Sequence, residues 1–433
     1  MIRFIFRITI LTHFLFAFSA NATSLNEALQ HALNNNSDIK LEKSRLDQVK
    51  ATKGDAISEF LPDINATYQR GRQKNDAVGI DRGDLDKIND QDVKQLNFTQ
   101  PIFSGFSSYN NAKEIKYNIK SAEEYYKSKK FEILLSATES YLNLFKAKNL
   151  VNLKTGDEEN TKKLLELIKD RNKSGEVGGS EVIKYQTYVA TAISDKLTAK
   201  KDLFKAEEEY NKIIGKSEVN KPIEVLFLPE IRKEEVSGNN QELLDLAVTN
   251  NPNLKTYLYK IKASRSAVNK SRGEFAPTVE IAASMSEQEN VTYLDNRDLR
   301  SEAIYLNVKV PLFQKGAEYV GVSKASKNLS FAKREYQTNK ENIIKEVNQT
   351  HKEFVFFGDL LKSQEELIEL TNSRIAKIEE QVKIGDGDVI DLLESKLELN
   401  KILIQQLNNK ADYILSYYKL MMLIGKFNLL AGN

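Results

Sequence analysis

Two acidic side chains stand three residues apart near the C-terminal end of the chain. Asp391 and Glu394 follow a turn of sequence Gly385-Asp386-Gly387-Asp388. If a helix begins there, the i, i+3 spacing places both carboxylates on one face. Such a pair attracts cations, and its oxygens suit multivalent ions. It also has a purely structural interpretation, because Asp388 is a natural N-cap and acidic residues in a first helical turn favour the helix dipole.

A similar turn lies about 210 residues earlier in the chain. It reads Ser174-Gly175-Glu176-Val177-Gly178-Gly179-Ser180-Glu181. Ser180 and Glu181 are the polar side chains at the start of the stretch that follows. Ser180 also has a purely structural interpretation, as the N-cap of a helix.

The residue types argue against enzymatic chemistry. The chain has no cysteine and three histidines, and no nucleophile–base pair, phosphate-binding loop or metal-spaced cluster is recognisable. His31 and His351 stand far apart in Lys/Glu-rich surroundings and are interpreted as helix-surface residues. The net charge is +2 with both signs interspersed, so no nucleic-acid footprint is present. We expect no cofactor, no metal and no nucleic acid.

The first residues resemble a secretory signal. Arg3 and Arg7 precede an apolar run, which ends at Ala20-Asn21-Ala22, a small-x-small cleavage pattern. We expect a signal peptide over residues 1–22. No stretch reaches the roughly 20 apolar residues that a transmembrane helix needs, so none is expected in the mature chain.

The remaining chain consists of two copies of one sequence unit, offset by about 210 to 215 residues. The matching landmarks occur in the same order in both copies. They are Asn36 with Asn251, Pro62 with Pro277, Pro101 with Pro311, Gly175 with Gly385, and Gly215 with Gly425.

Each copy predicts a helix, two strands and a very long helical hairpin. The helices are expected at about 24–60, with a break near 34–37, and at about 241–275. The first repeat is predicted over 23–216 (strands 62–70 and 93–101, hairpin 105–216) and the second over 241–433 (strands 278–286 and 303–311, hairpin 316–425), with 217–240 as a linker.

The predicted strands alternate apolar and polar residues. This pattern fits a half-buried antiparallel strand, and equally a barrel wall with lipid on one side and water on the other. Polar loops are expected between the strands at 71–92 and 287–302. The aspartates of the first loop would suit calcium by type, but their spacing matches no calcium-binding loop, which favours a solvated tip.

The long hairpins carry coiled-coil patterns. Nine positions in the last helix step by four and three, as in a heptad repeat: Leu393, Leu397, Asn400, Ile404, Leu407, Ala411, Ile414, Tyr418 and Met421. The region 131–153 has two apolar stripes, one through Leu134 and one through Ala137. Two stripes suit a helix with neighbours on both sides, as in a ring of helices, while an antiparallel hairpin with one broad face stays open.

This succession resembles the TolC family of outer-membrane factors over essentially the whole mature chain. The marks are Leu61-Pro62 and Ala276-Pro277 entering a strand, Gln100-Pro101-Ile102-Phe103 and Val310-Pro311-Leu312-Phe313 leaving one, and the two glycine turns. The resemblance implies a mainly α-helical chain with a membrane β-barrel. Three subunits with four strands each would close one barrel of twelve strands in the lipid of a Gram-negative outer membrane. Their helices would form an α-helical barrel through the periplasm.

The resemblance also implies partners and an activity. The homotrimer would be the exit duct of an efflux or type I secretion system. A periplasmic adaptor and an inner-membrane pump of the ABC, RND or MFS type would complete the duct.

By the same resemblance, Gly175 and Gly385 lie at the turns against which the adaptor docks. Asp391 and Glu394 line the narrowest point of the periplasmic entrance, and Ser180 and Glu181 help to latch it. The chain departs from the family's best-known pattern at two latch positions. Val382 and Gly387 stand where a tyrosine and an arginine are usual, and Lys383 and Arg171 are candidate substitutes.

Two other classes of protein remain as alternatives. A secreted coiled-coil structural protein or adhesin explains the signal and the heptads, but it does not explain paired amphipathic strands in both repeats. A periplasmic adaptor would have one hairpin flanked by several short-strand modules. An enzyme fits the residues least.

Overall fold

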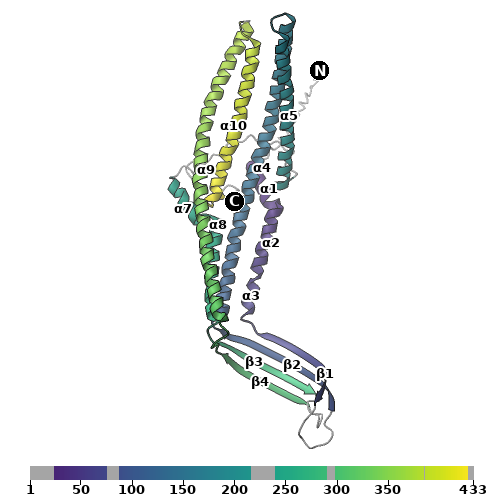
Figure 1. The fold of residues 1–433 in the computed structure, drawn as a ribbon, viewed down its shortest axis with the longest axis vertical. Helices are drawn as coiled ribbons and strands as arrows, with labels where there is room; N and C mark the ends of the chain where they lie inside the picture. Colours follow the sequence, from purple (N-terminus) through teal and green to yellow (C-terminus); the bar gives the residue numbers. More distant parts are fainter. Residues whose placement is uncertain (1–23, 76–86, 216–238, 290–297, 385, 428–433) are drawn as a thin grey trace, which may run out of the picture.

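A computed structural model describes residues 24–75, 87–215, 239–289, 298–384 and 386–427. The expected signal peptide, nearly all of the expected linker 217–240, and Gly385 lie outside the described residues. Figure 1 shows a long body of helices with a sheet at one end and two helix turns at the other. The sheet and the turns are therefore separated by the length of the long helices.

The element order repeats as the sequence predicted. The first repeat consists of α1 (Leu25–Asn35), α2 (Ser37–Ala51), α3 (Lys53–Ser58), β1 (Asp63–Asn75), β2 (Lys87–Ser104), α4 (Ser107–Lys173) and α5 (Gly179–Ile213). The second consists of α7 (Asn240–Asn250), α8 (Pro252–Gly273), β3 (Thr278–Glu289), β4 (Leu299–Lys309), α9 (Ala317–Ile384) and α10 (Val389–Leu423).

Two asparagines have the same role in the two repeats. Asn36 caps α2 through its side-chain oxygen, and its Nδ2 donates to the carbonyl of Ile213 at 3.0 Å. Asn251 caps α8, and its Nδ2 donates to the carbonyl of Leu423 at 2.9 Å. Each asparagine thus joins a helix start to the end of the return helix of its own repeat. The single helix predicted over 241–275 is wrong, because Asn251 ends one helix and Pro252 opens the next.

The long helix α4 lies between neighbours on two sides, as its two apolar stripes predicted. It packs against α5 and α2 and also against α8 and α10. Leu134, Ala137 and Leu144 are fully buried in the main core. With 67 residues, α4 is about 100 Å long. Within the described ranges, no helix combines the length and the apolar character that crossing a membrane demands.

The heptad positions of α10 face the first repeat. Ala411, Ile414, Tyr418 and Met421 are buried in the core. Asn400, in the same stripe, donates to Asp157 of α4 at 2.7 Å. A second face of α10 is buried against α9, where Tyr413 stacks on Phe354 with ring centroids 4.6 Å apart. The sequence predicted one packing seam along α10, but the helix has two, because it lies between α4 and α9.

The sheet is antiparallel with the order β1-β2-β3-β4, so β1 and β4 are its edges. Its strands run further than the alternating apolar pattern predicted, and residues 71–75, 87–92, 287–289 and 299–302 belong to strands and not to loops. Cross-strand ion pairs continue the pairing beyond the apolar residues. Arg72 meets Asp90 at 2.9 Å, and Arg300 meets Glu287 at 2.8 Å.

The two faces of the sheet differ in chemistry. Strand alternation and register place Ile64, Phe98, Ala283 and Ile304 in one row of one face, and the neighbouring rows add further apolar side chains. The opposite face is polar, and there Asn97 donates to Asn65 at 3.0 Å. The sheet is therefore amphipathic, although none of the described helices packs on either of its faces (Figure 1).

A close approach of two glycines fixes the junction between sheet and helices. Gly105 has φ +62°, and a Cβ there would lie 2.3 Å from the carbonyl oxygen of Gly273. We expect Gly105→Ala to lower the free energy of unfolding by about 1–3 kcal/mol, from backbone strain alone. Thermal unfolding of the purified protein measures this. Gly54→Ala is the control, because nothing lies within 4 Å of a Cβ at Gly54, and equal melting of the two variants would contradict the prediction.

Candidate functional site at the helix turns

The turns that join α4 to α5 and α9 to α10 lie at the end of the molecule opposite the sheet (Figure 1). Gly175 is exposed and has φ +80°, a conformation that glycine adopts without steric cost. It follows the last residue of α4 by two positions, as a helix-terminating glycine does. Gly385, the matching glycine of the second turn, lies outside the described residues, so its place at the turn stays a prediction.

A small apolar cluster holds the two hairpins together near their turns. Leu164 and Ile168 of α4, Tyr185 of α5 and Leu393 of α10 are all buried there. This cluster is separate from the main core, which lies nearer the middle of the body. The hairpins therefore make a local contact of their own beside the turns.

Two polar contacts cross between the hairpins beside this cluster. Arg171 at the end of α4 donates to Asp388 at 2.9 Å, and Asp388 also caps α10 by accepting from the N–H of Ile390. The Tyr185 hydroxyl donates to Glu394 at 3.1 Å. In both contacts the donor is on the first hairpin and the carboxylate on the second.

The predicted acidic pair is exposed at the start of α10, and only one member reaches the other hairpin. Glu394 accepts from Tyr185, whereas the Asp391 carbonyl accepts from Ser395 within the helix. Glu181 pairs with Lys184 at 2.9 Å on its own helix. In the described part of the chain, no hydrogen bond or ion pair joins Ser180 or Glu181 to Asp391 or Glu394.

Ser180 does not cap its helix. The N-cap of α5 is Gly178, which makes no side-chain cap bond, so Ser180 is already the second helical residue and is exposed. The cap interpretation of Ser180 is therefore wrong. The cap interpretation of Asp388 is confirmed.

The departure at Gly387 has a structural reason, whereas nothing in the structure explains the one at Val382. A Cβ at Gly387 would lie 2.6 Å from the backbone nitrogen of Val382 and 2.8 Å from the carbonyl carbon of Gln381. The turn is folded so closely onto the end of α9 that no larger residue fits at 387. Of the two candidate substitutes, Arg171 contacts the second hairpin, while Lys383 is exposed at the end of α9.

Tyr185 is the residue that the sequence interpretation missed. It is 4% exposed, and burial, followed by the hydrogen bond to Glu394, raises the pKa of its hydroxyl above the usual value. The hydroxyl therefore stays protonated and donates at neutral pH. Its position four residues after Glu181 places it on the same helix face, which is the signal that could have drawn attention to it.

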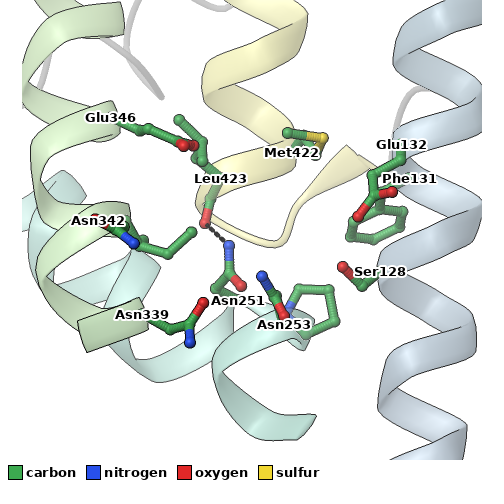
Figure 2. A pocket seen from close by; sticks show the side chains of 12 residues that line it. Ser128, Phe131, Glu132, Asn251, Asn253, Asn339, Asn342, Glu346, Met422 and Leu423 are labelled. Carbon is green, nitrogen blue, oxygen red and sulfur yellow. Dashed lines mark hydrogen bonds between the residues drawn. The ribbon is translucent and has the colours of Figure 1, made fainter. Parts of the chain in front are cut away.

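A cavity away from the turns lies in the middle of the helical body. Figure 2 shows this cavity of about 310 Å³, lined by side chains of α4, α8 and α9 and by the end of α10. Asn251, the least exposed of the polar residues that line it at 4%, already donates to Leu423 and accepts from the N–H of Leu254. Its amide is thus part of the framework and is not free for a ligand.

No group of three or more His, Cys, Asp or Glu side chains in the described residues is placed to hold a metal ion. The turns offer hydrogen-bond donors, carboxylates and an apolar contact. These groups can hold two hairpins together or release them.

Comparisons with known proteins match this architecture along the chain. The family model for "Outer membrane efflux protein" matches residues 28–216 and 243–426. The outer membrane efflux protein BepC of Brucella suis is 19% identical over 94% of this chain and 86% of its own. The alkaline protease secretion protein AprF of Pseudomonas aeruginosa is 20% identical over 84% of this chain and 77% of its own.

A solved structure has the same fold. The CmeC outer membrane channel of Campylobacter jejuni superposes with a TM-score of 0.79 at 18% identity, covering 93% of this chain and 86% of that one. The family match covers both repeats, each with its strands and its helical hairpin, and this chain therefore belongs to the outer membrane efflux protein family.

Proposed function

We propose that this chain is the outer-membrane exit duct of an efflux or type I secretion system and works as a homotrimer. The observation that carries the proposal is the amphipathic four-stranded sheet with two open edges, mounted at one end of two long helical hairpins. Backbone groups at an open edge have no partner in lipid, so only a closed barrel can span a membrane. Four strands cannot close alone, and copies of the chain must supply the rest.

Exposed stripes of apolar side chains on two of the helices support the same assembly. On α5, Ile183, Leu197 and Phe204 are about 60% exposed at heptad spacing, and on α9, Phe356 and Leu370 are equally exposed. The stripes lie on different helices, so a contact between them is heterologous and generates a ring if the rotation closes. Three copies give the barrel of twelve strands that the family resemblance implies.

Aromatic side chains mark a membrane boundary where strands meet helices. Phe60, Phe106, Phe313 and Tyr319 are between 50% and 75% exposed at this junction. Aromatic residues gather at the interfaces of membrane barrels, where their rings contact both lipid and headgroups. This junction is the level at which the duct leaves the outer membrane, so the hairpins extend into the periplasm.

The helix turns are then the periplasmic entrance. Gly175 and Gly385 form the surface against which a periplasmic adaptor docks, and an ABC, RND or MFS pump delivers the cargo from the inner membrane. Asp391 and Glu394 contribute six carboxylates to a ring at the entrance of the trimer. Ser180 and Glu181, in the first turn of α5, help to latch this entrance. The efflux and secretion relatives support a duct that serves small molecules, proteins or both.

Conductance in a planar bilayer tests this function. Because acidic rings select cations and bind multivalent ones, replacing both Asp391 and Glu394 with alanine should lower cation selectivity and weaken block by a trivalent ion added on the turn side. Replacing Asp76 and Asp81, in the chain between β1 and β2, should change neither. Unchanged selectivity and block would show that Asp391 and Glu394 form no selective ring at the entrance, and a soluble, non-conducting product would favour the adhesin.

A further inference from the structure

Towards the end of the sheet remote from the helices, the rows that contain Tyr68 to Arg72 of β1 carry their charges on one face only. We define the charged face as the strand residues that share the side of Ile64, Leu96 and Met285 in these rows: Arg70, Arg72, Asp90, Asp92, Lys94, Glu287, Glu289 and Arg300. The other side of the same rows has Gln69, Gly71, Gln91, Val93, Gln288 and Leu299, without a charge.

The pairing register fixes this assignment. Leu96 stands opposite Met285, and one step of two residues further Lys94 stands opposite Glu287, which itself faces Arg300. Residues two apart in a strand lie on the same face. The charged face is therefore the continuation of the apolar face along the same side of the sheet.

The basic side chains of the charged face stand further out than their acidic partners. The side chain of Arg70 is 70% exposed against 23% for Asp92, and that of Arg300 is 80% exposed against 32% for Glu287. Lys94 is 53% exposed, and its partners Glu287 and Glu289 are 32% and 37% exposed. The four basic and four acidic residues make the face neutral in sum, but its most exposed charged groups are guanidinium groups.

Sheet stabilisation alone does not explain this distribution. Cross-strand ion pairs stabilise a sheet on either face, and a strand end standing free in water would carry charges on both. Here charge begins on the apolar side at Glu302, which faces Met285, and continues on that side through the rows of Tyr68 to Arg72. The other face has its first charge beyond these rows at Lys87, the first residue of β2. This is the level of the lipid headgroups if the apolar face contacts lipid.

We propose that the charged face binds the phosphate groups of outer-leaflet lipid headgroups, an assignment that rests on the proposed membrane orientation. Guanidinium groups bind phosphate oxygens with two parallel hydrogen bonds, and a lysine adds a point charge. The less exposed carboxylates hold the basic groups at cross-strand spacing. Three copies would surround the barrel with such sites, whereas the uncharged face would line the duct.

Lipid binding by the detergent-purified full chain tests the proposal. Native mass spectrometry would compare bisphosphorylated lipid A with dephosphorylated lipid A, with inorganic phosphate added as a competitor. Each basic residue near an anionic lipid surface contributes about fivefold in binding, so the double variant Arg72→Gln/Arg300→Gln should lose at least tenfold. Lys309→Gln is the matched control, since Lys309 is an exposed strand residue of the opposite face.

A second variant separates lipid binding from sheet stability. Asp90→Asn/Glu289→Gln removes the same kind of ion pair but should retain or strengthen lipid A binding, because carboxylates that compete with phosphate are gone. Equal binding of the two lipids by the unaltered protein, or unchanged binding by the arginine variant, would overturn the proposal. Displacement by millimolar inorganic phosphate alone would identify a free-phosphate site instead. A chain that conducts but shows no phosphate preference loses this inference and keeps its proposed function.

Discussion

Ile414→Asp is expected to prevent the chain from accumulating as a folded, assembled protein. Ile414 is 1% exposed in the main core, where α10 packs against the first repeat. A buried carboxylate without a partner costs several kcal/mol, which is a large part of the total stability of a typical domain. The yield of heat-resistant oligomer in membrane extracts measures the effect. In a trimer the cost is incurred three times.

Gln405→Asp is the control for this substitution. Gln405 lies on the same helix but is exposed, so an aspartate there stays in water and should leave the yield unchanged. A normal yield of the Ile414 variant would show that this face of α10 is accessible to solvent and would contradict the packing described.

Tyr185→Phe is expected to raise the resting conductance of the duct. The change keeps the ring in the apolar cluster and removes the hydrogen bond to Glu394. A hydrogen bond to a charged group contributes about 1.5–3 kcal/mol, so the population with separated turns should rise at least about tenfold. Adding Arg171→Leu, which removes the pair with Asp388, should raise it further, but less, because exposed ion pairs contribute little.

Tyr188→Phe is the matched control. Tyr188 is on the same helix, packs edge-on against Tyr185, and is 46% exposed. Single-channel recordings without adaptor or pump compare the open probability of the two variants. Similar values for both would show that the Tyr185 hydroxyl does not help to hold the hairpins together.

Much of the fold was predictable because its elements leave local patterns. Strands alternate with period two, and the long helices carry heptads and lack proline, so α4 and α9 were located to within a few residues at both ends. Strand ends were less predictable. The strands extend through Arg72 and Asp90 because charges pair across the ladder, and this pairing appears only once the register is known.

The candidate site was predictable as a place but not as a set of contacts. Spacing identified Glu394 as a turn-proximal carboxylate, but its partner Tyr185 is 209 residues away in the chain. The role of Gly387 depends on how closely the turn folds onto the backbone of α9. Asn400 was assigned to the heptad seam, yet the side chain it meets there, Asp157, belongs to the other repeat.

The order of strands in the sheet has a consequence for biogenesis. Strands β2 and β3 are neighbours, and their register joins Lys94 to Glu287 across the whole first helical hairpin and helices α7 and α8 of the second repeat. During synthesis, the β1–β2 pair is complete long before the strand that covers its edge exists. Contacts of such high sequence separation form slowly, and an unpaired edge recruits other strands in the meantime. The open edge of β2 in the first repeat is therefore exposed to aggregation until β3 of the second repeat has been made and pairs with it.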